Sequence, residues 1–127
     1  MNAERPLRIL HLEDSADDAE LIRERLIATG LAVQIDWAGN EEDFTSFLRH
    51  GGYDLILADY RLPGFAASAA VLLTRSLCPG VPFIAVTGAV GDEKAIELIK
   101  LYPLSKHVLR SMNKRRAISH RAGMIFS

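Results

Sequence analysis

DLILADYRLPG, residues 54–64, is the stretch that decides the fold. Its apolar run Ile56–Ala58 is typical of a buried strand, and the run stops abruptly at an acid, Asp59. Pro63 and Gly64 then mark a turn. A carboxylate at the end of a buried strand carries a desolvation cost, so we expect Asp59 to have a use at that position.

Three other apolar runs have the same character, and a helical pattern follows each of the four. Ser15 and Asn40 stand where helix N-caps are expected. Strands alternating with helices over short connections predict an α/β fold, with a parallel sheet covered by helices on both faces. The predicted strands are residues 7–12, 31–38, 54–59 and 81–88, and the predicted helices are residues 15–30, 40–50, 65–77 and 91–101.

Length and composition indicate one domain, residues 1–127. The chain is 49% hydrophobic, enough for a core without cross-links. Its single cysteine, Cys78, forms no intrachain disulfide and is predicted to be a packed thiol. No apolar run has the length of a signal peptide or approaches the roughly 20 residues of a membrane span. We therefore expect a soluble, cytoplasmic protein with no membrane partner.

The net charge of −1 hides an uneven distribution. Residues 1–100 carry a net charge of −7, whereas residues 101–127 carry six basic side chains and no acidic one. Such a basic segment can be solvated, contact a partner, or contact nucleic acid. It contains no recognition-helix pattern, so nucleic-acid binding is not expected, and residues 102–127 are an atypical C-terminal segment.

Acids and a hydroxyl follow three of the predicted strands. Glu13 and Asp14 follow the first, Asp59 ends the third and Thr87 ends the fourth. The carboxyl ends of parallel strands share one edge of the sheet, where ligands bind in open α/β folds. Clustered carboxylates repel one another, and a hard divalent cation such as Mg²⁺ relieves that repulsion. An aspartate beside such a cation points to phosphoryl transfer with the carboxylate as nucleophile.

Three motifs carry a resemblance to a known family. LHLEDS, LILADYRLPG and PFIAVTG, residues 10–15, 55–64 and 82–88, closely resemble the receiver domain of bacterial two-component response regulators. The resemblance covers residues 7–101 and implies a flavodoxin-like, doubly wound, five-stranded parallel sheet. It also implies a phosphorylation-dependent switch, with a sensor histidine kinase or phosphotransfer protein as donor and Mg²⁺, or Mn²⁺ in its place, as cofactor.

The resemblance assigns a role to each matched position. Asp59 corresponds to the phosphoacceptor, and Thr87 corresponds to the switch hydroxyl. Glu13 and Asp14 correspond to the acidic pair, with Asp14 the more direct Mg²⁺ ligand and Glu13 acting through water. With Asp59 they hold the metal, and the backbone carbonyl of Arg61 is a further ligand.

The C-terminal segment departs from the family pattern. The family has a lysine at the end of a fifth strand, and this chain reads YPLSKHVLR over residues 102–110. Either Arg110 or Lys106 takes the place of that lysine, and a weak fifth strand is expected around His107–Leu109. Arginine is a planar fork and not a compact point charge, which puts the switch in doubt. The segment is either a divergent tail or the product of a different reading frame or replaced C-terminus.

Three functions compete on this evidence. The leading one is a phosphorylated signalling domain that is not a turnover enzyme. A Mg²⁺-dependent phosphatase would need a second acid two residues after the nucleophile, and Arg61 stands there. A receiver-like scaffold that binds proteins with impaired phosphorylation is the alternative that the altered C-terminus favours. Its apolar end, residues 124–126, also suggests a homodimer.

Overall fold

The computed structural model describes residues 5–59, 62, 64–100 and 124–126. Five parallel strands form one sheet in the order β2-β1-β3-β4-β5, with helices on both faces, which confirms the predicted flavodoxin-like architecture. The strands are β1 Leu7–Leu12, β2 Val33–Ala38, β3 Leu55–Asp59, β4 Phe83–Val86 and β5 Met124–Phe126, and the helices are α1 Ala16–Ala28, α2 Glu41–His50, α3 Ala67–Leu77 and α4 Gly88–Lys100.

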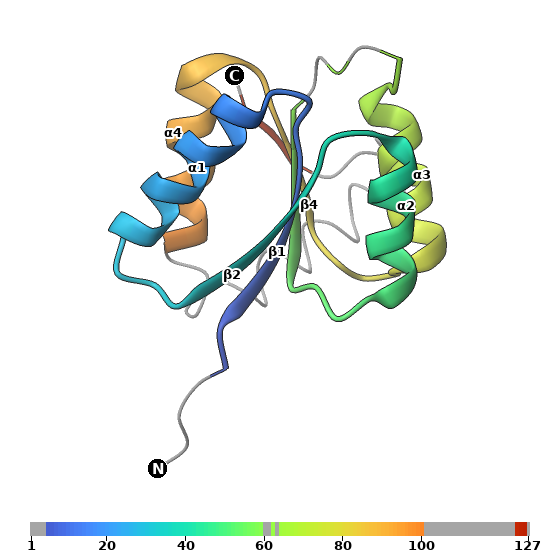
Figure 1. Ribbon diagram of the computed structural model, residues 1–127, viewed down its shortest axis with the longest axis horizontal. Coiled ribbons are helices and arrows are strands. Elements are labelled where there is room, and N and C mark those ends of the chain that lie inside the picture. Colours follow the sequence, from blue (N-terminus) through green and yellow to red (C-terminus); the bar gives the residue numbers. More distant parts are fainter. Residues whose placement is uncertain (1–4, 60–61, 63, 101–123, 127) are drawn as a thin grey trace.

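The two faces of the sheet carry different helices. Helices α1 and α4 cover one face, and α2 and α3 cover the other (Figure 1). Successive residues of β3 point to opposite faces, so Leu55 and Leu57 pack with α1 and α4, whereas Ile56 and Ala58 pack with α2 and α3. Both faces are buried, which explains why β3 is apolar from Leu55 to Ala58, before it ends at Asp59. In the described part of the chain, no helix is both long and apolar enough to span a membrane.

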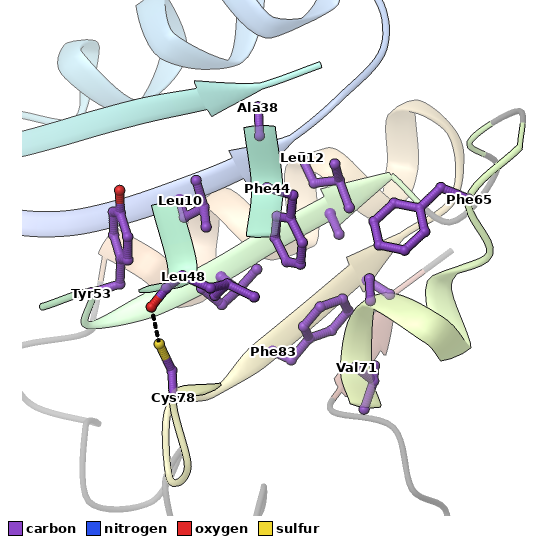
Figure 2. Packing of buried hydrophobic residues seen from close by; sticks show 14 residues of the cluster. Leu10, Leu12, Ala38, Phe44, Leu48, Tyr53, Phe65, Val71, Cys78 and Phe83 are labelled. Atoms are coloured by element: carbon purple, nitrogen blue, oxygen red, sulfur yellow. Dashed lines mark hydrogen bonds between the residues drawn. The ribbon is translucent and has the colours of Figure 1, made fainter. Parts of the chain in front are cut away.

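The core on the α2–α3 face contains the predicted packed thiol. Phe44 is fully buried, and its ring meets the ring of Phe65 edge-on at 5.9 Å between centroids. The Cys78 thiol is buried in the same cluster and donates to the Leu48 carbonyl oxygen at 3.2 Å (Figure 2). The residue that follows helix α3 is thereby tied to helix α2.

The first two helices begin where the sequence predicts. The Ser15 hydroxyl accepts from the Asp18 backbone N–H at 3.2 Å, and the Asn40 side chain accepts from the Asp43 N–H at 2.8 Å. Both are side-chain N-caps, which satisfy backbone donors that a helix start leaves open. They fix the two turns that leave β1 and β2 at the functional edge.

Helices α3 and α4 begin elsewhere than expected. Helix α3 begins at Ala67 and not at Phe65, because Phe65 turns into the core after Gly64, which has a positive φ of 73°. Helix α4 begins at Gly88, directly after Thr87, and not at residue 91. The first turn of α4 contains no acidic residue, and Asp92 is the first acid in the helix.

The fifth strand is Met124–Phe126, which pairs in parallel with Ile84–Val86 of β4. The residues around His107–Leu109, where the sequence suggests a weak fifth strand, lie outside the described part of the chain. Three apolar residues at the end of a poorly periodic segment are too short a run to be distinguished by pattern from a free apolar end.

One buried side chain of β1 is polar. His11 is only 2% exposed, and its Nδ1 atom has no hydrogen-bond partner within the described residues. Burial lowers the pKa of His11 from 6.5 to about 4, because the charged ring would lose its hydration. The folded state therefore holds a neutral imidazole through the mildly acidic range.

We expect His11→Leu to remove part of the acid sensitivity of the fold. The folded pKa of His11 lies below the unfolded one, so its contribution to stability is lost as pH falls from about 6.5 through 4. The difference in unfolding free energy between wild type and variant should change by about 2 to 3 kcal/mol over that range. Urea unfolding at pH 7.5, 6, 5 and 4 measures it. Because the other titrating groups are common to both proteins, parallel stability curves would contradict the prediction.

Candidate functional site

The register of the sheet brings three carboxylates to one place. Leu12 of β1 lies beside Ala58 of β3, so the next residues along each chain, Glu13 and Asp59, lie at the same edge. Oxygen atoms of Glu13, Asp14 and Asp59 all lie within 4.8 Å of one another. The structure thus assembles the three acids that the sequence singles out at the ends of β1 and β3.

Thr87 stands at the same edge. Asp59 is the register partner of Val86 in β4, and Thr87 is the next residue, half-buried between the end of β4 and the start of α4. Three other predicted site residues, Arg61, Lys106 and Arg110, lie outside the described part of the chain.

The acidic cluster makes the ionised form of Glu13 costly. Glu13 is buried, Asp59 is half-buried and Asp14 is exposed. The pKa of Glu13 is raised to about 7, chiefly because the side chain is buried. The Ser15 backbone N–H, at 3.2 Å, lowers this pKa, whereas the negative charge of Asp59 and a hydrogen bond with Asp14 contribute to the increase. Two unit charges 4.8 Å apart, the upper limit of the separations in this cluster, repel by roughly 3.5 kcal/mol at an effective dielectric constant of about 20.

The donor set fits a hard divalent cation. All three groups offer carboxylate oxygens, the ligands that Mg²⁺ and Mn²⁺ accept. One carboxylate is buried and one is exposed, so a cation held among them keeps a side open to water. Mg²⁺ characteristically retains several waters and takes few protein ligands, which agrees with this arrangement.

Sequence reasoning missed one contact at the site. The indole N–H of Trp37, near the end of β2, donates to the backbone carbonyl oxygen of Glu13 at 2.6 Å. The alternation of apolar residues in β2 identifies Trp37 as a strand residue, but only the register shows that its ring reaches the acidic pair. The sequence did contain one signal for this contact. Trp37 stands near the carboxyl end of β2, the strand that neighbours β1, and β1 ends just before the acidic pair.

A fourth carboxylate, that of Asp92, interacts electrostatically with the site. The shift of the α4 start places Asp92 within the helix, half-buried and on the side that packs with α1. Burial raises the pKa of Asp92, the charges of Asp59 and Asp18 add to the effect, and Arg25 of α1 opposes it. The neighbouring Asp17 is exposed in the first turn of α1, where negative charge suits the helix dipole.

Comparisons with known proteins agree on one family, although no protein-family model matches the chain. The chain is 32% identical over 89 residues to the regulatory protein LuxO of Vibrio vulnificus strain YJ016, a match that covers 70% of this chain and 19% of LuxO. The chain thus spans about a fifth of the length of the curated relatives it matches.

Solved structures give the same answer for the fold. The receiver domain of sensor histidine kinase PA1611 from Pseudomonas aeruginosa, which has a magnesium ion in its active site cleft, is 26% identical, with a TM-score of 0.58 and coverage of 71% of this chain and 75% of that one. The receiver domain of the hybrid histidine kinase CckA gives a TM-score of 0.63 at 19% identity and covers 73% of this chain and 95% of that one.

The strand order, the three converging carboxylates and the similarity to LuxO and to solved receivers point to a single family. In its fold, its acidic site and its sequence, this chain is similar to the receiver domains of two-component response regulators.

Proposed function

We propose that this domain accepts a phosphoryl group on Asp59 and acts as a phosphorylation-dependent switch in two-component signalling. The observation that carries the proposal is the convergence of Glu13, Asp14 and Asp59, whose oxygens lie within 4.8 Å of one another at the carboxyl edge of a receiver fold. The donor in this proposal is the phosphohistidine of a sensor histidine kinase or phosphotransfer protein, the partners that this family implies.

The proposed reaction is an in-line transfer to a carboxylate oxygen. An oxygen of Asp59 attacks phosphorus, the phosphorus–nitrogen bond of the donor breaks, and the imidazole leaves with the bonding electrons and takes up a proton. Glu13, Asp14 and Asp59, with the Arg61 carbonyl, would hold Mg²⁺ or Mn²⁺. When bound, that cation neutralises the charge of the phosphoryl oxygens.

The remaining residues act on the phosphoryl group after transfer. Thr87 follows Val86, the register partner of Asp59, and this position supports the proposal that its hydroxyl donates to a phosphoryl oxygen. Rotation of that hydroxyl would change the β4–α4 junction, where α4 begins directly after Thr87. Arg110 or Lys106 is proposed to supply the positive charge that a lysine gives other receivers.

In this proposal the domain is not a turnover enzyme. Asp59 would be phosphorylated, and water would later cleave the acyl phosphate to inorganic phosphate and the free carboxylate. The domain would thus act as a signalling component, with the cytoplasm as its proposed location. Its surface would dock a kinase or phosphotransfer partner, and a homodimer through residues 124–126 remains part of the hypothesis. Binding of nucleic acid or a membrane is not part of it.

Phosphorylation by a small-molecule donor tests the acceptor directly. Wild type incubated with acetyl phosphate and Mg²⁺ should gain one phosphoryl group by intact-protein mass spectrometry. Asp59→Asn should show no gain, because an amide lacks the nucleophilic oxygen charge. Asp17→Asn, which removes an exposed carboxylate of α1 outside the cluster, should be phosphorylated like the wild type.

Two results would contradict this proposal. A gain of mass that persists in Asp59→Asn would place the phosphoryl group on another residue. A wild type that binds Mg²⁺ and gains no mass would favour the alternative of a receiver-shaped scaffold with the chemistry disabled.

The acidic cluster should bind the cation without any phosphodonor. We expect Asp14→Asn to weaken Mg²⁺ binding by about tenfold or more, or about 1.4 kcal/mol, because a charged ligand is lost from a three-carboxylate set. Asp17→Asn removes the same charge one turn away and should change the affinity less than about twofold. Isothermal titration calorimetry at fixed pH measures both. Equal losses in the two variants would mean that only long-range charge, and not ligation by Asp14, governs binding.

A further inference from the structure

Glu13 is held by hydrogen bonds on both sides of its Cα atom. Its backbone N–H donates to the Ala38 carbonyl oxygen at 3.0 Å, which extends the β1–β2 ladder one residue past the strand. Its carbonyl oxygen accepts the indole N–H of Trp37 at 2.6 Å. The first bond is ordinary sheet pairing, whereas the second comes from a side chain that the proposed phosphoryl chemistry does not use.

The accepting carbonyl belongs to the peptide unit that joins the two acids. A peptide unit is planar, so fixing the direction of the Glu13 carbonyl also fixes the direction of the Asp14 N–H. The remaining freedom of Asp14 lies in its own side chain and the dihedrals that follow. A donor at this carbonyl therefore restrains how Asp14 approaches Glu13 and Asp59.

The register of β2 explains how the indole reaches this carbonyl. Trp37 is the partner of His11 in β1, two residues before Glu13, and the long side chain extends toward the end of the strand. Gly39 lies beside this contact, and a side chain there would meet it at ordinary van der Waals distances. A Cβ atom at Gly39 would lie 3.4 Å from Cζ2 of Trp37 and 3.8 Å from the Glu13 carbonyl oxygen.

Filling the hydrophobic core does not account for this tryptophan. The Trp37 side chain is 44% exposed, although β2 otherwise packs Val33 and Ile35 against the α1 face. The ring of Trp37 is open to water, and its N–H donates to one backbone oxygen. We therefore attribute the presence of this side chain to that hydrogen bond more than to core packing.

We propose that Trp37 is a positioning residue for the cation site. Its indole N–H holds the Glu13–Asp14 peptide so that the two carboxylates are oriented toward Asp59 before a cation arrives. The inference rests on the proposed cation site and adds a residue outside the acidic cluster. The benefit is preorganisation, because without the anchor the like-charged side chains relieve their repulsion by turning away from each other.

The chain contains a single tryptophan, so a tryptophan analogue changes position 37 alone. Benzothienylalanine keeps the bicyclic shape and replaces the indole N–H by sulfur, whereas 5-fluorotryptophan keeps the donor and is the matched control. Trp37→Phe is a second, genetically encoded variant. Calorimetric titration with Mg²⁺ gives the affinity, and thermal unfolding without the cation shows whether the fold is intact.

We expect benzothienylalanine at position 37 to weaken Mg²⁺ binding roughly three- to tenfold, the range for loss of one neutral hydrogen bond. 5-Fluorotryptophan should bind like the wild type, and all the cation-free proteins should unfold at similar temperatures. Amide hydrogen exchange at Asp14 and Ser15 should be faster without the N–H, which is a readout independent of the cation.

The outcomes separate the two proposals. Wild-type affinity and unchanged exchange with benzothienylalanine would overturn the role of Trp37 and leave the cation site standing. If 5-fluorotryptophan weakened Mg²⁺ binding as much as benzothienylalanine, the effect would come from the ring and not from its N–H. That result would also overturn the role of Trp37. A wild-type protein that binds no Mg²⁺ would overturn the cation site itself and the inference with it.

Discussion

The site depends on one constraint, the parallel register of β1 and β3. A register that pairs Leu12 with Ala58 places Glu13 and Asp59 at one level of the sheet edge, and a slip of one residue would turn one of them to the opposite face. The apolar residues just before these acids are buried on both faces, which makes such a slip expensive. The core therefore holds like charges close together in a way that the charges by themselves would oppose.

The helices on the α1 face determine the electrostatic surroundings of that cluster. Because α4 begins directly after Thr87 and packs with α1, it carries Asp92 into the field of Asp59 and Asp18, with Arg25 as the opposing charge. The negative potential at the edge thus comes from more residues than the three that converge. A cation experiences this wider field as well as its direct ligands.

Much of this arrangement follows from the sequence because several levels of pattern agree. The β1 bounds, the caps at Ser15 and Asn40, and the acids at strand ends all rest on local rules of periodicity and turn chemistry. The start of α4 was predicted too late, because Gly91 and Asp92 resemble a helix start and Gly88 does not.

Tertiary features were beyond the reach of local pattern. Strand β5, Met124–Phe126, is three residues long, and its partner is fixed only by the edge that β4 leaves open. The Trp37 hydrogen bond depends on the register between β1 and β2, which a one-dimensional pattern does not contain.

The buried thiol of Cys78, between α2 and α3, offers a way to measure local opening of this protein. Cys78 is the only cysteine, burial raises its pKa, and its hydrogen atom is directed to the Leu48 carbonyl. Because the thiolate is the form that reacts, alkylating reagents modify Cys78 only when the α2–α3 side opens. The rate at which Cys78 is alkylated therefore reports how often the α2–α3 side of the domain opens. No engineered cysteine is needed for this measurement.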